Sequence, residues 1–162
     1  MEIGLTDTAT HTRIESVYRT LGPRLWRAVY AYSGDRAVTD DAVAEAFVQA
    51  LRRGDAIRSP EPWLWRASFR IAAGLLQDRR RWVEFDSSRT PDNPGNRDDG
   101  LVSELAELTD HQRACLVLHY YAGYATAEIS DIVGISPAAV RMSLTRGRRG
   151  LRKVLERGEA HD

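Results

Sequence analysis

One short segment near the C-terminus limits the fold more than any other feature of the sequence. Between residues 125 and 141, two stretches with apolar residues at helical spacing flank a single glycine, Gly134. A glycine there permits the left-handed backbone of a tight turn. Ser136 can cap the second helix, and Pro137 suits its first position. The segment therefore predicts a helix-turn-helix, a motif whose second helix enters the major groove of DNA.

The second helix of this motif has two faces. The face predicted to be buried carries Val140, Leu144, Leu151 and Leu155. On the other face, small residues at the start allow close approach to bases, and arginines further along can contact phosphates or guanine edges. The candidate contacts to duplex DNA are Ser136, Pro137, Ala138, Arg141, Met142, Thr145, Arg148 and Arg149. An ordinary helical hairpin with a basic face is the alternative interpretation.

Positive charge gathers in two places, although the formal net charge of the 162 residues is zero. From Ser136 to Arg157 the residues are basic at seven positions and acidic only at Glu156. A second basic cluster comprises Arg66, Arg70, Arg79, Arg80 and Arg81. Because phosphate binding needs local positive charge, this distribution predicts two nucleic-acid sites, separated by a stretch in which acids dominate. Two solvated helix faces remain the alternative.

Helical spacing of apolar residues extends along most of the chain. The expected helices run from Arg13 to Gly34, from Asp35 or Thr39 to Arg53, from Trp63 to Arg81, from Leu101 to Leu108 and from Thr109 to Tyr121. Residues 86–100 are rich in Pro, Gly, Asn and Asp and have no apolar period, which indicates a flexible linker. We expect an all-α fold of two small helical domains, residues 13–85 and 101–158, with a helix-turn-helix in the second.

Several classes of protein find no support in the sequence. The four histidines lack the spacing of a metal site, and no glycine-rich phosphate loop is present, so we expect no catalytic site, cofactor or metal. His111, Cys115 and His119 lie four residues apart on one helix, and a metal there is weighed against simple core packing. No apolar run is long enough to span a bilayer and the first 12 residues are polar, which favours a cytoplasmic protein.

The second half of the sequence resembles a known family. From Leu105 to Leu155 the chain is similar to the upstream-element-binding domain (region 4) of the extracytoplasmic-function (ECF) sigma factors of bacterial RNA polymerase. The matching residues are Leu108-Thr109, Gln112-Arg113, Gly123, Glu128-Ile129, Gly134-Ile135-Ser136, Val140, Leu144, Arg146 and Leu151-Arg152. From Val17 to Arg81 the chain resembles the other conserved domain of that family, region 2.

The resemblance implies roles for residues of the first half. Asp41 and Glu45 correspond to an acidic helix that docks on the core polymerase. The loop before the third helix would receive a flipped base of the downstream element, and the helix itself would contact the melted strand. The implied contacts are Arg58, Ser59, Glu61, Trp63, Arg66, Arg70, Arg79, Arg80 and Arg81. Interleaved aromatic and arginine residues suit single-strand binding, but aromatics at helical spacing also pack in cores.

These features predict a sigma factor that directs RNA polymerase to promoters and assists promoter opening. The implied partners are core RNA polymerase, promoter DNA as duplex and melted strand, and an anti-sigma factor. A stand-alone regulator that uses the same helix-turn-helix is the alternative; it would bind duplex DNA without polymerase, as a dimer on paired half-sites.

Overall fold

The helical spacing of the sequence produces helices along both segments that the computed structural model describes, residues 3–85 and 100–161. The first half contains α1 (Ile3–Ser33), α2 (Arg36–Arg53), a short 3-10 turn η1 (Gly54–Ala56) and α3 (Pro60–Phe85). The second half contains α4 (Gly100–Leu105), α5 (Asp110–Leu116), a π-helical turn η2 (Val117–Tyr121), α6 (Thr126–Val133) and α7 (Pro137–Glu159). The all-α prediction is confirmed, and neither described segment contains a helix that could cross a membrane.

The first and third helices are longer than the sequence pattern predicts. The first begins at Ile3 rather than Arg13 and continues past Pro23 without a break. The third begins at Pro60, because proline suits a first helical turn and an acidic side chain there favours the helix dipole. Glu61 therefore lies in the first turn of α3 and not in the preceding loop, while Arg58 and Ser59 remain in that loop.

The boundary between α1 and α2 settles which residue caps the second helix. Gly34 has a left-handed backbone with φ 67°, and the Asp35 carboxylate accepts a hydrogen bond from the Val38 N–H at 3.0 Å. Thr39 is instead fully buried, and its hydroxyl donates to the Asp35 carbonyl at 2.7 Å. The alternative start at Thr39 is therefore wrong, since Asp35 already accepts a hydrogen bond from one of the N–H groups that have no partner within the helix.

The helix-turn-helix forms as the sequence predicts. Gly134 ends α6 with φ 80°, and the Ser136 hydroxyl accepts a hydrogen bond from the Ala139 N–H at 3.1 Å. The predicted capping box before α5 is also present between Thr109 and Gln112. Leu155 departs from the prediction, because it is 42% exposed near the end of α7. The helix there has extended beyond the elements that cover Val140 and Leu144.

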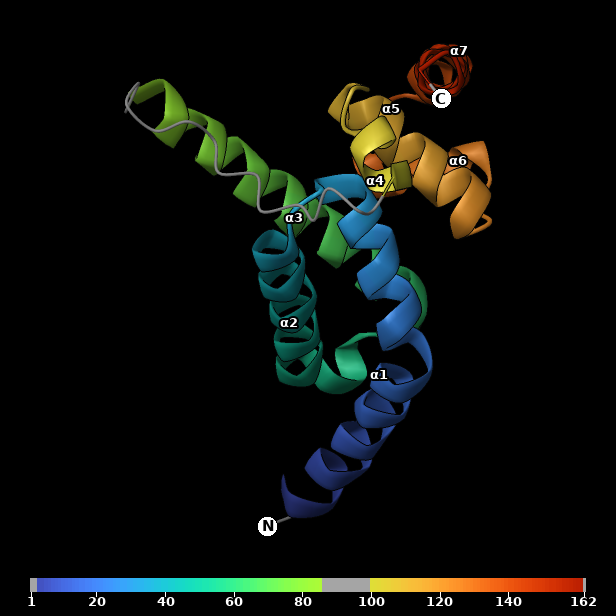
Figure 1. The fold of residues 1–162 in the computed structure, drawn as a ribbon. Coiled ribbons are helices and arrows are strands. Elements are labelled where there is room, and N and C mark those ends of the chain that lie inside the picture. The colour runs from blue at the N-terminus through green and yellow to red at the C-terminus, as the bar shows by residue number, and fades with distance from the viewer. Residues whose placement is uncertain (1–2, 86–99, 162) are drawn as a thin grey trace.

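The two halves share one hydrophobic core and pack against each other. In Figure 1, α1, α2 and α3 form one bundle, and α4 to α7 lie across its upper end. Helix α6 contacts α3, while α4, α5 and η2 contact α1. The edge of the buried Trp65 ring meets the Tyr124 ring at 5.8 Å between centroids. The predicted linker lies outside the described residues, except that Gly100 begins α4.

Candidate nucleic-acid and polymerase interfaces

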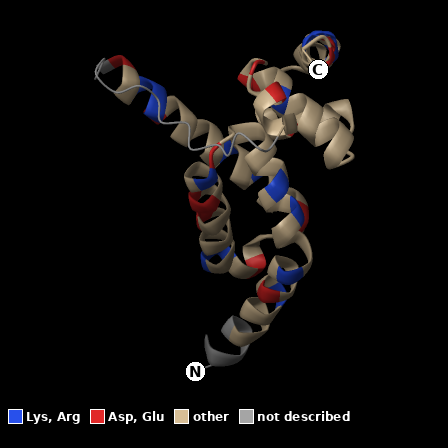
Figure 2. Cartoon of the chain, viewed as in Figure 1, with Lys and Arg blue, Asp and Glu red and all other residues tan. Residues whose placement is uncertain are grey.

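The outward face of α7 is open to solvent. Every candidate for contact with duplex DNA is exposed: Ser136, Pro137, Ala138, Arg141, Met142, Thr145, Arg148 and Arg149. Exposed Arg152 and Lys153 extend the same basic surface one turn further, and Figure 2 shows basic residues around α7 at the C-terminal end. A capped, solvent-facing helix start followed by arginines is the arrangement a reading helix needs in a DNA groove.

Close packing beneath α7 fixes how this face is presented. A Cβ built on Gly147 would lie 3.1 Å from a methyl carbon of Leu116, and one built on Gly150 would lie 2.7 Å from Leu108. Larger residues at these two positions would push α7 away from α5 and from the segment that precedes it. The glycines therefore allow the basic helix to lie directly on the second half's core.

The basic residues of α3 differ in the contacts that they make. Arg66 and Arg81 are exposed, and neither side chain forms a hydrogen bond or an ion pair with another described residue. Arg79 forms an ion pair with the buried Asp35 carboxylate at the start of α2. Arg70 donates to the Asp131 carbonyl of α6 at 3.2 Å, and Arg80 binds Asp110 of α5 at 2.6 Å. Arg70 and Arg80 thus connect the two halves.

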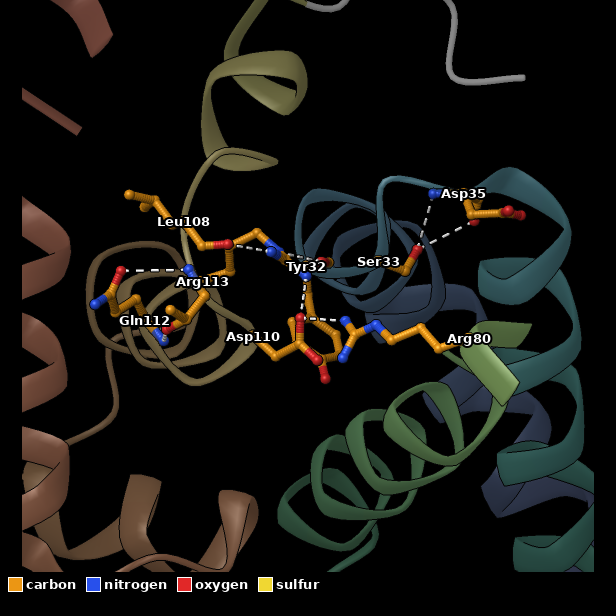
Figure 3. A network of polar contacts seen from close by, with 9 residues as sticks. Tyr32, Ser33, Asp35, Arg80, Leu108, Asp110, Gln112 and Arg113 are labelled. Carbon is orange, nitrogen blue, oxygen red and sulfur yellow. Dashed lines mark hydrogen bonds and ion pairs between the residues drawn. The ribbon is translucent and has the colours of Figure 1, made fainter. Parts of the chain in front are cut away.

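A buried arginine forms the centre of the contact between the halves (Figure 3). Arg113 of α5 is 8% exposed, and its Nε donates to the Tyr32 carbonyl at the end of α1 at 2.8 Å. Its terminal nitrogens donate to the Leu108 carbonyl at 2.5 Å and to Asp110 Oδ1 at 2.7 Å. We call Arg113, Asp110, Arg80 and the Tyr32 carbonyl the Arg113 network.

The charges of this network shift the pKa values of its members. Burial raises the pKa of Asp110, but hydrogen bonds and attraction from Arg80 and Arg113 outweigh it, so the pKa lies below its usual value. The hydrogen bond with Asp110 raises the pKa of Arg80. Burial, with the Asp110 charge, raises the pKa of the Tyr32 phenol to about 12. The Asp110 carboxylate therefore stays ionised between two guanidiniums at neutral pH.

The loop predicted to receive a flipped base is held by the N-terminal helix. Arg13 of α1 donates to the Ile57 carbonyl at 2.8 Å, directly before exposed Arg58 and Ser59. Trp63 follows on α3, half-buried, with the guanidinium carbon of Arg53 5.6 Å from its ring centroid. These contacts hold the backbone of the loop in place, while its polar side chains face solvent.

Two further aromatics of α3 are not available to bases. Trp65 is 1% exposed and Phe69 is 3% exposed, and their rings stack at 6.1 Å within the core. The core interpretation of these residues is therefore correct. Trp82, by contrast, is 67% exposed near the end of α3.

The acidic face of α2 is exposed and also carries an apolar residue that the sequence analysis does not single out. Asp41 and Glu45 are both exposed, one helical turn apart, and Gln49 donates to Glu45 at 3.0 Å. Val48 follows at the next position on the same face and is 38% exposed. An exposed apolar side chain beside two carboxylates suits a protein partner with a basic surface. The seven-residue spacing between Asp41 and Val48 is the sequence pattern that indicates that both lie on this face.

The possible metal site around Cys115 does not assemble. Cys115 is fully buried, and burial raises the pKa of its thiol to about 11. His111 is exposed, whereas the His119 Nδ1 lies 3.1 Å from the Tyr124 carbonyl. Across residues 3–85 and 100–161, no three potential ligands come together as a metal site would require.

Comparison with known protein sequences gives matches along most of the chain. A family model described as Sigma-70, region 4 matches residues 99–151. Over 150 residues the chain is 31% identical to the ECF RNA polymerase sigma factor SigL of Mycobacterium tuberculosis, covering 82% of each chain. It is 21% identical over 157 residues to the ECF RNA polymerase sigma factor SigM of Bacillus subtilis, covering 90% of this chain and 96% of SigM.

Two solved structures share the fold. The sigma factor RpoE in complex with the anti-sigma factor NepR, from Bartonella quintana, aligns with a TM-score of 0.75 and 16% identity over 88% of this chain and 96% of that one. CnrH in complex with the cytosolic domain of CnrY aligns with a TM-score of 0.68 and 20% identity, over 93% and 92%. At these identities the matches establish the architecture of both halves.

Proposed function

Because the chain belongs to the ECF sigma factors of RNA polymerase, we propose that it directs the core polymerase to specific promoters and assists in opening them. The observation that carries this proposal is the exposed, Ser136-capped helix α7, whose basic face extends from Arg141 to Lys153 above a helix-turn-helix core. An accessible helix of this kind can enter a major groove without any rearrangement of its own domain.

In this proposal the second half, residues 101–158, reads the upstream promoter element as duplex DNA. The exposed start of α7 supports close approach to base edges, since Pro137 and Ala138 are small and Ser136 is occupied as the cap. Arg141, Arg148 and Arg149 then contact phosphates or guanine edges.

The first half, residues 13–85, holds the polymerase and binds the downstream element. Asp41, Glu45 and the exposed Val48 are the proposed docking surface on α2. Arg58 and Ser59 in the loop, with Glu61 and Trp63 at the start of α3, are the proposed contacts to a flipped base. Exposed Arg66 and Arg81 hold the strand backbone directly, whereas Arg70 and Arg80 do so once they leave their partners in the second half.

We further propose an anti-sigma factor as a partner, because the structural relative RpoE is in complex with the anti-sigma factor NepR. A sigma factor acts where polymerase and chromosome are, so we propose a cytoplasmic location. Its activity as proposed needs no catalytic site, cofactor or metal, since initiation by this route consists of binding and strand separation.

In vitro transcription with core polymerase on genomic fragments tests the proposal. We expect transcripts from a small set of promoters that depend on adding this chain. Asp41→Arg with Glu45→Arg should weaken capture of core polymerase by at least tenfold, because the proposed partner surface is basic. The exposed pair Glu15→Arg with Glu159→Arg makes an equal change of charge on α1 and α7 and serves as the control. Tight duplex binding without polymerase, together with no stimulation of transcription, would instead identify a stand-alone regulator.

A further inference from the structure

An exposed tyrosine outside the helix-turn-helix lies against the basic helix. Tyr120 is 62% exposed and is the fourth residue of Val117–Tyr121, which forms a π-helical turn. The Ala122 N–H bonds to the Val117 carbonyl five residues earlier at 3.1 Å. Such single π turns are rare in helices and occur frequently at functional sites. Tyr120 lies within this wider turn, on the flank of α7.

The phenol contacts one of the arginines proposed to bind DNA. Arg148 Nη1 donates a hydrogen bond to the Tyr120 hydroxyl oxygen at 3.0 Å. A tyrosine hydroxyl can accept a hydrogen bond and still donate its own hydrogen. No acceptor for that hydrogen exists among the described residues, so it faces solvent beside the guanidinium. Tyr120 and Arg148 together therefore present hydrogen-bond donors to the same region of space.

The turn that holds Tyr120 is anchored on both sides. The His119 ring meets the Tyr120 ring edge to face at 4.8 Å, and His119 itself is fixed by the Tyr124 carbonyl. Arg24 of α1 donates to the Tyr121 carbonyl at 2.9 Å. These contacts limit the motion of the tyrosine ring before any DNA arrives, which reduces the entropy lost when it binds.

Arg148 also lies in line with other residues of the proposed reading face. Arg141 precedes it by seven residues, or about two helical turns, and Thr145 lies between them on the same side of α7. A phosphate backbone that follows this row meets the Arg148 guanidinium at the flank where Tyr120 is placed. The phosphate oxygens are acceptors, which is what both exposed donor groups require.

We propose that Tyr120 is a positioning residue for upstream-element recognition: its hydroxyl holds the Arg148 guanidinium toward a DNA phosphate and donates its own hydrogen to that phosphate. The inference rests on the proposed function of α7. Sequence alone gives no signal for it, because the two residues are 28 positions apart and lie in different elements, η2 and α7.

The test is a double-mutant cycle with the full chain bound to core polymerase. Its probe is a labelled promoter fragment recovered in the transcription experiment above. Tyr120→Phe removes only the hydroxyl, and Tyr121→Phe is a matched control on the neighbouring exposed tyrosine. We expect Tyr120→Phe to weaken binding about fivefold and Tyr121→Phe to have no effect. Arg148→Ala should weaken it further and reduce the slope of log affinity against log salt by about one, whereas Tyr120→Phe leaves the slope unchanged.

In the Arg148→Ala background, Tyr120→Phe should cost clearly less than in the wild-type background, because its hydroxyl no longer has a guanidinium to hold. Equal losses in both backgrounds, or wild-type affinity of Tyr120→Phe, would overturn the inference while leaving the proposed function intact. If Arg141→Glu binds the fragment with unchanged affinity, the wild-type complex with core polymerase does not bind it through α7. The proposed function then fails, and the inference fails with it. Thermal unfolding of each variant checks that the fold is retained.

Discussion

On α3, the side chains of Arg70, Arg79 and Arg80 each contact a group elsewhere in the protein, whereas on α7 the guanidiniums of Arg141 and Arg149 have no partner within the described segments. The two proposed DNA-binding surfaces therefore start from different states. The α7 surface can meet a phosphate directly. The α3 surface must first exchange internal bonds for bonds to DNA, and two of those bonds hold the second half in place.

Burial decides how much this exchange costs. The Arg80 side chain is 57% exposed, so water can replace its partner at small cost. Arg113 is buried, and loss of its contacts would leave carbonyl groups unpaired. The connection between the halves thus combines one strong contact with several weak ones.

The largest effect should come from Arg113→Ala. We expect it to lower the free energy of unfolding by about 3 kcal/mol, because it removes a buried charge and leaves the Tyr32 and Leu108 carbonyls without a donor. Urea denaturation measures the loss. Arg81→Ala, an exposed arginine without a partner in the described ranges, is the control and should change stability by less than about 0.5 kcal/mol. A loss below about 1 kcal/mol for Arg113→Ala would mean that the halves do not depend on this contact.

Charge reversal on α7 should affect binding rather than stability. We expect Arg141→Glu with Arg148→Glu to weaken holoenzyme binding to the upstream element about 100-fold, or roughly 2.7 kcal/mol. The unfolding midpoint should hardly move, because both side chains are exposed. DNase protection of the upstream element gives the readout, and Arg19→Glu with Arg52→Glu makes an equal change of charge on α1 and α2. Unchanged protection in the α7 variant would remove that helix from the proposed interface.

Asp110→Asn should give an intermediate, pH-dependent effect. The folded chain lowers the pKa of Asp110, so its contribution is complete above the unfolded pKa of about 4 and is lost as pH falls through the lower folded value. At pH 7 we expect a loss of about 1 to 2 kcal/mol, and below about pH 4 the difference between variant and wild type should narrow steadily as pH falls. Thermal unfolding from pH 3 to 7 measures this. A difference independent of pH would show that the ionised carboxylate is not what stabilises the network.

The smallest effect should come from Arg80→Ala. This side chain is exposed, and Asp110 retains Arg113 as a partner, so we expect a loss below about 1 kcal/mol. A double-mutant cycle with Asp110→Asn in urea isolates the pair. A coupling above about 2 kcal/mol would contradict the view that α3 can release this contact easily when DNA arrives.

Local signals in the sequence were sufficient for the helix-turn-helix. Gly134, Ser136 and Pro137 act through their own backbone and immediate neighbours, so their roles follow from residue type and spacing. The choice between Asp35 and Thr39 was not settled in the same way, because both can cap a helix and only the burial of Thr39 decides. The roles proposed for exposed residues such as Asp41 and Arg58 stay predictions.

Contacts between the halves could not be predicted, because residue types and their spacing do not indicate which groups meet. Arg113 and Tyr32 are 81 residues apart, and the acceptor is a backbone carbonyl that any residue could supply. Arg70 likewise binds the carbonyl of Asp131 rather than its carboxylate. Within residues 3–85 and 100–161, Arg80 and Asp110 form the one ion pair between the halves that complementary side chains could have suggested.

The carbonyl acceptor of Arg113 has a consequence for hybrid proteins made by joining halves of different relatives. Substitution in the donor sequence cannot remove a main-chain oxygen, so a foreign first half will still offer Arg113 its acceptor wherever the end of α1 keeps its path. The Arg80–Asp110 pair requires the correct side chain on both parents. Hybrids should therefore keep the Arg113 contact between their halves, whereas the Arg80–Asp110 pair forms only when both parents supply its side chains.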